Sequence, residues 1–322
     1  MSKAIQIHAT GGPDVMRYED VAVGVPGPGD VRIQQTAIGV NFIDVYHRSG
    51  LYPVPRLPAI LGQEGAGVIS AVGDGVEDLS VGDRVAYAGC PGSYAQERLA
   101  KADRLVKIPE AITDVTAAAM MLQGMTVRYL LKETYRVTPD TVLLFHAAAG
   151  GVGLIACQWA RAIGATMIGT VSTDEKAALA RAHGCTHVIN TQSENFVARV
   201  AELTQGKGCD VVYDSIGKDT FPNSLECLKP RGLWVSFGNS SGPVPAFDLS
   251  HLKGSLFATR PSLFAYTAAR SDLLSNAADL FEMVISGHIK IAVHHKYPLS
   301  QAADAHRALE ARKTTGSIVL IP

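Results

Sequence analysis

The feature that most constrains the fold is the stretch VLLFHAAAGGVG, residues 142–153. Its apolar beginning is typical of a buried strand, and a run of alanine and glycine follows. Apolar residues then recur at helical spacing, at Val152, Ile155, Trp159 and Ile163. Either a phosphate-bearing ligand touches the backbone at this turn, or a strand and a helix simply pack closely there.

The turn matches the dinucleotide-binding pattern Gly-x-Gly-x-x-Gly, with Ala148 in place of the first glycine. The missing side chain at Gly150 would let the backbone approach a pyrophosphate, and Gly153 would let the helix begin close to the strand. The first N–H groups of the helix, including those of Gly151 and Val152, are unpaired and favour phosphate binding. A position after a strand and before a helix favours dinucleotide binding over close packing alone.

Two styles of sequence follow one another along the chain. Residues 4–109 contain short β-type runs separated by Gly, Pro and Asp, as in an all-β barrel or sandwich. Residues 113–135 are rich in Ala and Leu and contain no Pro, which predicts one or two helices. From Thr141 onward, contiguous apolar strands alternate with helices, which indicates a doubly wound (Rossmann) parallel sheet.

The end of the chain, GSIVLIP, predicts a strand that needs a sheet to join, so we expect it to return to the first domain. A chain of 322 residues is long enough for two domains. The predicted division is 1–123 with 293–322 as a β-rich catalytic domain, and 124–292 as a dinucleotide-binding domain.

Composition excludes several classes of function. The net charge is −1 and basic residues are scattered, which argues against binding to nucleic acid or to an anionic membrane. The N-terminus lacks the pattern of a secretion signal, and no apolar run suggests a membrane span. Five widely spaced cysteines argue against a disulfide framework. We therefore expect a cytoplasmic protein.

The tip of the second parallel strand indicates which dinucleotide is bound. An acid at this tip would hold the ribose 2′-hydroxyl of NAD, but the strand ends at Ser172 without one. Ser172 and Lys176 instead suit a 2′-phosphate, although Lys176 could also be part of a solvated helix face. Asp174 and Glu175 fit the first turn of the following helix. The pattern favours NADPH over NADH.

Motifs along nearly the whole chain carry a family resemblance. They are GVNFIDVYHRSGLYP, LGQEGAGVISAVG, VGDRVAY, LLFHAAAGGVGLIACQWA, VVYDSIG, VSFGNSSG, TRPSL and GSIVLIP. With them the chain resembles the zinc-independent quinone oxidoreductases, the family that includes zeta-crystallin, within the medium-chain dehydrogenase/reductase superfamily. The resemblance implies a GroES-like β-rich catalytic domain and a Rossmann domain.

The same motifs bear on metal binding. Zinc-dependent relatives have cysteine at the position of Asn41 and Gly-His-Glu at the position of Gly62, Gln63 and Glu64. Amides are poor zinc ligands compared with thiolate and imidazole, so we expect no metal. Without a Lewis acid, the expected acceptors are quinones or α,β-unsaturated carbonyls, which take hydride readily.

The resemblance also implies a set of site residues. The candidates for the acceptor pocket are Asn41, Asp44, Tyr46, Tyr52 and Gln63. The candidates for cofactor contacts, besides those of the glycine-rich turn and Ser172 and Lys176, are Asn41, Phe42, Thr126, Tyr129, Thr191, Ser215, Phe237, Gly238, Asn239, Ser240, Arg260, Ser262 and Arg312.

Simpler structural roles remain open for several of these residues. Tyr46 or Tyr52 could donate a hydrogen bond to the acceptor oxygen, or each could be an aromatic residue that supports the cleft. Asp44 could simply cap a helix. Arg260 and Arg312 could form surface ion pairs. A protein general acid is not required, because a hydroquinone oxyanion can take its proton from water.

The leading hypothesis is an NADPH-dependent quinone oxidoreductase, expected to form a homodimer by joining edge strands. An NADPH-dependent enal or enone reductase needs the same cofactor geometry and is the alternative enzyme. The third hypothesis is a non-enzymatic nucleotide- or RNA-binding module, which the net charge of −1 weakens.

Overall fold

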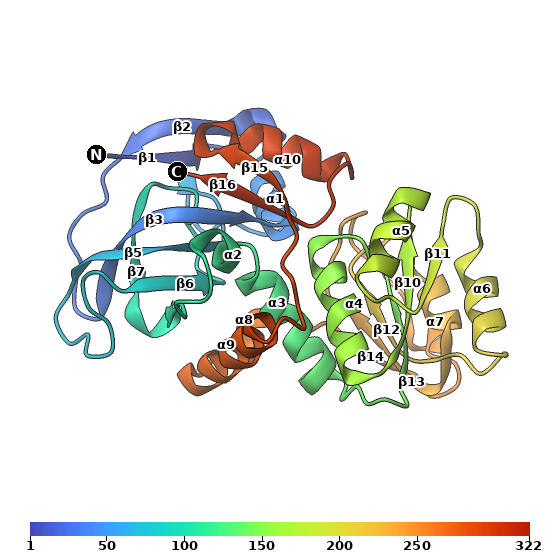
Figure 1. The fold of residues 1–322 in the computed structure, drawn as a ribbon. Helices are drawn as coiled ribbons and strands as arrows, with labels where there is room; N and C mark the ends of the chain where they lie inside the picture. Colours follow the sequence, from blue (N-terminus) through green and yellow to red (C-terminus); the bar gives the residue numbers. More distant parts are fainter. The chain divides into compact units, whose positions relative to one another are not determined.

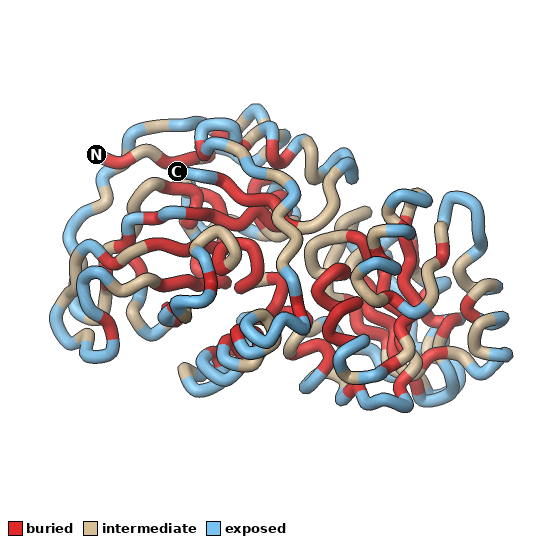
Figure 2. The backbone as a smooth tube through the Cα atoms, viewed as in Figure 1, coloured by how far each residue is buried: buried red, intermediate tan, exposed pale blue.

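The computed structural model describes residues 1–322, and the chain divides into two compact units. Unit 1 comprises Met1–Met125, Tyr266–Ile285 and Ile291–Pro322, and unit 2 comprises Thr126–Ala265 and Ser286–Lys290. Each unit encloses its own buried segments (Figure 2). The predicted domain boundaries stay a prediction.

Unit 2 is built on a six-stranded parallel sheet (Figure 1). Its strands are β9 (Val142–Phe145), β10 (Thr166–Val171), β11 (His187–Asn190), β12 (Cys209–Asp214), β13 (Leu228–Ser236) and β14 (Phe257–Thr259). They lie in the order β11-β10-β9-β12-β13-β14, so the chain first builds one half of the sheet and then returns to build the other. This is the doubly wound Rossmann order, and the predicted fold class is confirmed.

Helices cover both faces of this sheet (Figure 1). They are α4 (Gly151–Ile163), α5 (Asp174–Ala182), α6 (Phe196–Leu203) and α7 (Asn223–Glu226), with α8 (Leu263–Tyr266) at the end of the unit. Helix α4 begins after Gly150 in extended backbone and ends at Gly164, whose φ of 88° suits only glycine well. Of the four apolar residues at helical spacing, Ile155 and Trp159 are buried and Val152 and Ile163 are half-buried; all residues from 153 to 160 are buried, so the helix is enclosed on every side there.

Unit 1 is β-rich and is built from two sheets. The larger contains β3 (Asp30–Val40), β5 (Glu64–Val72), β6 (Arg84–Ala88), β7 (Glu97–Lys101), β8 (Val106–Lys107), β15 (Val293–Pro298) and β16 (Ser317–Ile321). The smaller contains β1 (Ser2–Ile7), β2 (Met16–Val21) and β4 (Ala59–Ile60). The last strand, β16, pairs antiparallel with β3, with Val319 opposite Gly39, so the predicted return of the chain end is confirmed.

Five helices complete unit 1 or connect it to unit 2. They are α1 (Phe42–Ser49), α2 (Asp114–Ala118), α3 (Met121–Tyr129), α9 (Arg270–Ile285) and α10 (Ala302–Glu310). Single turns lie at Pro13–Val15, Ala102–Arg104, Leu130–Thr134, Leu249–His251 and Leu299–Gln301. Helix α9 is grouped with unit 1, where Leu280 packs against Gly124.

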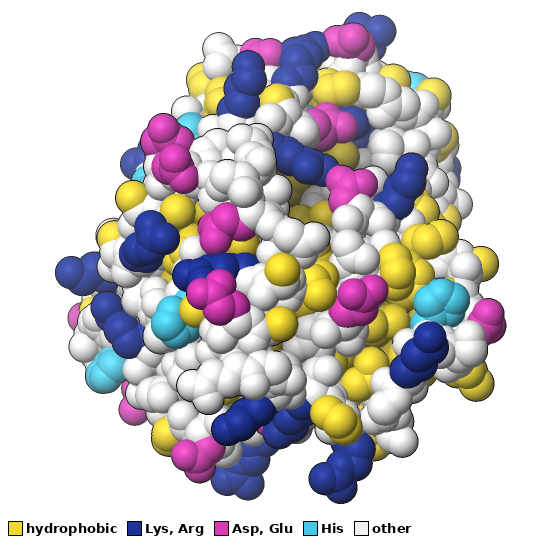
Figure 3. Space-filling model, turned by 90° about the vertical axis from the view of Figure 1, so that its right-hand side faces the viewer, with side chains coloured by type: hydrophobic (Ala, Val, Ile, Leu, Met, Phe, Trp, Pro, Cys, Tyr) yellow, Lys and Arg dark blue, Asp and Glu magenta, His cyan; other side chains and the backbone are white.

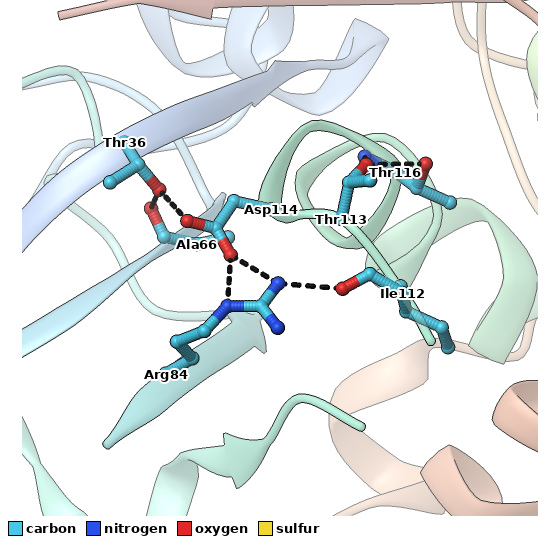
Figure 4. A network of polar contacts seen from close by, with 7 residues as sticks. All are labelled: Thr36, Ala66, Arg84, Ile112, Thr113, Asp114 and Thr116. Carbon is cyan, nitrogen blue, oxygen red and sulfur yellow. Dashed lines mark hydrogen bonds and ion pairs between the residues drawn. The ribbon is translucent and has the colours of Figure 1, made fainter. Parts of the chain in front are cut away.

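Ionic and hydrogen-bonding contacts fix α2 on the larger sheet (Figure 4). The Asp114 carboxylate accepts from Thr36 of β3 at 2.7 Å and from the Arg84 guanidinium of β6 at 2.6 and 2.8 Å. Thr113 precedes the helix and caps it by accepting from the N–H of Thr116 at 3.2 Å. Because α3 follows directly, these contacts also fix where α3 begins.

No helix of the chain combines the length and apolar character that crossing a membrane requires.

Candidate functional site

In unit 2, most predicted cofactor residues lie in the loops or in the first helical turns that follow the parallel strands. These are Gly150, Gly151, Val152 and Gly153 after β9, Ser172 and Lys176 after β10, Thr191 after β11, Ser215 after β12, Phe237, Gly238, Asn239 and Ser240 after β13, and Arg260 and Ser262 after β14. The carboxyl ends of parallel strands share one edge of a sheet, which is where doubly wound proteins bind their ligands. Two further candidates, Thr126 and Tyr129, are buried on α3 instead.

The two glycines of the turn have different surroundings. A Cβ atom added at Gly153 would lie 2.4 Å from the carbonyl oxygen of Ala147 and 2.6 Å from that of Ala148. The same atom at Gly150 would meet only the oxygen of Ala147, at 3.3 Å. Gly153 is therefore required by packing inside the protein. Packing restricts Gly150 much less, which agrees with a ligand approaching the backbone there.

The beginning of α4 is suited to an anionic group. No side chain caps the helix, and its first turn contains no acidic residue. The first N–H groups of a helix have no partner within it and carry a partial positive charge. The residues present therefore fit the pyrophosphate of a dinucleotide.

At the tip of β10 the two residues predicted to bind a 2′-phosphate lie together. The Lys176 ammonium donates to the Ser172 hydroxyl at 3.2 Å. Thr173 caps α5 by accepting from the backbone N–H of Lys176, and Asp174 accepts from the Asn190 amide at 2.8 Å. Of the two acidic residues in the first turn of α5, Asp174 and Glu175, Asp174 is engaged by Asn190, while the hydroxyl and the ammonium lie side by side.

The loops after the other strands are held by local contacts. The Thr191 hydroxyl donates to the carbonyl of Val171, which joins the ends of β11 and β10. The N–H of Ser240 donates to the carbonyl of Ser215 at 3.1 Å, and a Cβ atom at Gly238 would lie 2.8 Å from the same oxygen. The loops after β12 and β13 are therefore interlocked.

A buried polar network beneath these loops was not predicted. The His146 ring nitrogens contact the hydroxyls of Thr170 at 2.9 Å and Ser224 at 3.0 Å, and Ser224 donates to Asp214 at 2.8 Å. Asp214 also accepts from the N–H groups of Ile216 and Gly217. Burial lowers the pKa of His146 and favours the neutral ring. The only signal in the sequence was a polar residue at the end of each apolar strand.

In unit 1, Asn41 and Asp44 form the beginning of α1. The Asp44 carboxylate accepts from the backbone N–H of Asn41 at 2.9 Å and from the Tyr94 hydroxyl at 2.9 Å, both on the same oxygen. Complete burial raises the pKa of Asp44 to about 7. These contacts agree with the capping role that the sequence left open for Asp44.

The two candidate tyrosines pack against each other. The ring centroids of Tyr46 and Tyr52 are 5.0 Å apart in an edge-to-face arrangement, and Phe42 lies 6.2 Å from Tyr46. Tyr46 is buried, whereas Tyr52 is half-buried. The segment from α1 to Tyr52 thus contributes an aromatic cluster next to Asn41. Arg312 follows α10 in the same unit, with a φ of 56°.

Gln63 and Glu64 are both buried beside α1 and α3. The Gln63 amide oxygen has no hydrogen-bond partner. Glu64 accepts from the Asn41 side-chain amide at 2.7 Å and from the backbone N–H of Leu122, near the beginning of α3, at 2.7 Å. Burial raises the pKa of Glu64 to about 8, and these donors oppose the shift. Sequence reasoning quoted Glu64 in a motif but gave it no role.

No group of three or more His, Cys, Asp or Glu side chains lies together in a way that could hold a metal ion.

Comparisons with known proteins cover the whole chain. Residues 27–110 match the alcohol dehydrogenase GroES-like domain, and residues 151–282 match the domain family described as zinc-binding dehydrogenase. The chain is 52% identical to the quinone oxidoreductase of Pseudomonas aeruginosa, and the match covers 100% of both proteins. It is 48% identical to the 2-haloacrylate reductase of a Burkholderia species, over 100% of this chain and 99% of that protein.

A solved structure gives the same result. The quinone oxidoreductase of Escherichia coli, solved in complex with NADPH, has a TM-score of 0.98 and 50% identity, and the match covers 99% of this chain and 100% of that one. The chain therefore belongs to the quinone oxidoreductase family of the medium-chain dehydrogenases and reductases.

Proposed function

We propose that the protein is an NADPH-dependent quinone oxidoreductase that acts without a metal ion. The observation that carries the proposal is the Lys176–Ser172 contact of 3.2 Å at the tip of β10, after a glycine turn whose Gly150 is not required by packing. A hydroxyl and an ammonium at this tip suit the 2′-phosphate that distinguishes NADPH from NADH. A structure of a relative at 50% identity contains NADPH, which supports this reading.

The cofactor would be held by the loops at the carboxyl edge of the unit 2 sheet. The beginning of α4 would bind the pyrophosphate, and Ser172 and Lys176 the 2′-phosphate. The remaining contacts would come from Asn41, Phe42, Thr126, Tyr129, Thr191, Ser215, Phe237, Gly238, Asn239, Ser240, Arg260, Ser262 and Arg312. NADPH supplies a hydride when it is bound, and the protein's contribution is to bind, orient and exclude water.

The acceptor pocket would be formed by Asn41, Tyr46, Tyr52 and Gln63, with Asp44 holding the backbone of Asn41 in place. A tyrosine hydroxyl would donate a hydrogen bond to the acceptor oxygen as negative charge develops on it. The reduced product is weakly basic and can take its proton from water, so no protein acid is required. Activity is expected to survive a strong chelator; loss that only zinc restores would contradict the metal-free mechanism.

A second candidate substrate class is favoured by one specific observation. The 2-haloacrylate reductase shares 48% of its sequence with this chain over nearly its full length, and the substrate in its name is a conjugated, electron-poor alkene. Stopped-flow measurement of NADPH oxidation with quinones, enals, enones and 2-haloacrylates separates the two classes. We expect kcat/KM to be highest for quinones. Turnover of the alkenes alone would replace the proposal.

A non-enzymatic RNA-binding role has less support. Lys and Arg side chains are interspersed with Asp and Glu over the face seen in Figure 3, whereas RNA binding requires a continuous basic surface. Absence of turnover with every acceptor, together with salt-dependent retention on RNA, would favour this role instead.

We further propose a cytoplasmic homodimer joined through β14. This strand ends the unit 2 sheet, so one of its edges is unpaired, and Phe257 is 61% exposed on it. Five cysteines that are all free and buried fit a reducing compartment. Sedimentation equilibrium tests the dimer: Phe257→Lys is expected to shift the mass toward that of the monomer, and an unchanged mass would exclude this interface.

A further inference from the structure

Four buried side chains of unit 1 form a continuous hydrogen-bonded chain. The Glu64 carboxylate accepts from Asn41 Nδ2 at 2.7 Å, and Asn41 Oδ1 accepts from Gln123 Nε2 at 3.1 Å. Gln123 Oε1 accepts from the Ser317 hydroxyl at 2.8 Å. The four residues come from β5, the beginning of α1, α3 and β16, so segments distant in sequence meet at Asn41.

The contacts of Glu64 determine the direction of the whole chain. The side-chain amides of Asn41 and Gln123 could each be turned by 180° without a change of shape. Above its pKa of about 8, Glu64 is ionised and only accepts hydrogen bonds, and its other oxygen already faces the backbone N–H of Leu122 at 2.7 Å. Asn41 must therefore point its Nδ2 toward Glu64 and its Oδ1 toward Gln123.

The fold makes room for this carboxylate. Gly39 of β3 lies directly opposite Glu64 in the strand pair. A Cβ atom at Gly39 would lie 2.3 Å from the Glu64 carboxylate oxygen and 2.3 Å from the carbonyl of Ala118. Burying a carboxylate completely is costly, and an apolar side chain would pack at this position without that cost. The arrangement indicates that a hydrogen-bond acceptor, the Glu64 carboxylate, is required at this position.

We propose that Glu64 is a positioning residue that holds the amide of Asn41 in one orientation for reduction of the acceptor. In that orientation Asn41 retains one Nδ2 hydrogen and one Oδ1 lone pair in fixed places for the bound ligand. The inference rests on the proposed function, because it takes Asn41 to be in contact with cofactor or substrate.

The substitution Glu64→Gln tests the proposal because it reverses the chain without removing a partner. The new amide must use its oxygen for the N–H of Leu122, so its NH₂ group faces Asn41. Asn41 and Gln123 then both turn by 180°, and the Ser317 hydroxyl rotates to the carbonyl of Ala119, which lies 3.0 Å away. Every group keeps a hydrogen bond, so the variant is expected to fold, but Asn41 presents its donor and acceptor to the ligand in exchanged positions.

The experiment is a double-mutant cycle of Glu64→Gln and Asn41→Ala, with kcat and KM measured for a quinone above the pKa of Glu64, near pH 8.5. Each single variant is expected to lower kcat about tenfold or more, and the double variant no further than the worse single one, because Glu64 acts through Asn41. The midpoint of thermal unfolding of Glu64→Gln is not expected to fall below that of the wild type, because the amide has no charge to bury. Glu97→Gln, in a surface ion pair with Arg32, is the matched control and should retain the wild-type kcat.

The outcomes separate the inference from the proposed function. Two outcomes overturn the positioning role and leave the proposed function standing. In the first, the losses in kcat of the two single variants multiply in the double variant. In the second, Glu64→Gln has the wild-type kcat while Asn41→Ala is impaired. An Asn41→Ala variant with wild-type kcat and KM overturns the placement of Asn41 in the site. If Glu64→Gln does not fold, Glu64→Asp is used in the same cycle, since its shorter carboxylate cannot reach both Asn41 and Leu122.

Discussion

The glycine-rich turn has two explanations, contact with a ligand and close packing. The first applies to Gly150 and the second to Gly153. The carbonyls of Ala147 and Ala148 leave no room for a Cβ atom at Gly153, whereas Gly150 has a single neighbour at 3.3 Å and a φ of −76° that any residue adopts. The motif was recognisable from spacing alone. The different roles of the two glycines were not recognisable, because they depend on which carbonyl oxygens face each glycine.

Alanine at each position separates packing from ligand contact. Gly153→Ala is expected to destabilise the protein by about 2 kcal/mol, because overpacking forces the backbone to move. Gly150→Ala is expected to leave the free energy of unfolding nearly unchanged but to weaken NADPH binding about tenfold, or ~1.4 kcal/mol. Urea unfolding and fluorescence titration with NADPH measure the two effects. Equal destabilisation by both substitutions would show that the turn is glycine-rich for packing alone.

Residues that act through distant partners could not be predicted from the sequence. Glu64 was visible beside Gln63, but its partners Asn41 and Leu122 come from other elements. Their proximity results from the pairing of β5 with β3 and from the placement of α3, which a linear pattern does not contain. An acidic residue directly before an apolar strand was the only available signal.

Elements with a regular apolar pattern were predicted well. The spacing of Leu273, Ala277, Leu280, Phe281 and Val284 predicts one helical face; the first four are buried in α9, and Val284 is half-buried. The unit to which α9 belongs was not predictable from this spacing, because it depends on the surface against which the helix packs. Gly124 of α3 gives Leu280 the space to pack there.

The 2′-phosphate site proposed at the junction of β10 and α5 predicts the cofactor preference. Ser172 and Lys176 lie on either side of the Thr173 cap, in contact at 3.2 Å. The double substitution Ser172→Asp and Lys176→Ala is expected to lower kcat/KM for NADPH at least tenfold and to raise it for NADH, since a carboxylate binds the ribose hydroxyl and repels a 2′-phosphate. The ratio of the two kcat/KM values is the readout. Lys207→Ala, on the loop after α6, is a control, and an unchanged ratio in the double variant would refute the 2′-phosphate assignment.

For the whole molecule, the chain order of elements was the informative pattern. Alternating strands and helices specify a parallel sheet, and right-handed crossovers leave few possible strand orders. The return of β16 to β3 followed from the need of a terminal strand for a sheet. The alternating pattern does not show how deeply charges are buried, although two buried carboxyls, Asp44 and Glu64, affect the stability of unit 1.

The burial of the Asp44 and Glu64 carboxyls can be tested by measuring how the free energy of unfolding depends on pH. The pKa of Glu64 rises from 4.5 to about 8 on folding and that of Asp44 from 3.8 to about 7, so the folded protein binds these protons more tightly. Their stabilising contribution is complete below the unfolded pKa values and is lost as the pH rises through the folded ones. Glu64 alone is expected to cost the wild type on the order of 2 kcal/mol of unfolding free energy between pH 6.5 and 8.

The substitution Glu64→Gln removes this titration and leaves the other titratable groups of the protein in place. The negative charge of Asp44 and the phenols of Tyr87 and Tyr94, the titratable groups that interact with Glu64, remain in the variant. Between pH 6.5 and 8, chemical unfolding is expected to show a greater fall in the free energy of unfolding for the wild type than for the variant, by on the order of 2 kcal/mol. Glu97→Gln should follow the wild type. Parallel curves for wild type and Glu64→Gln would mean that the carboxyl is ionised at its ordinary pKa, stabilised fully by Asn41 and the beginning of α3.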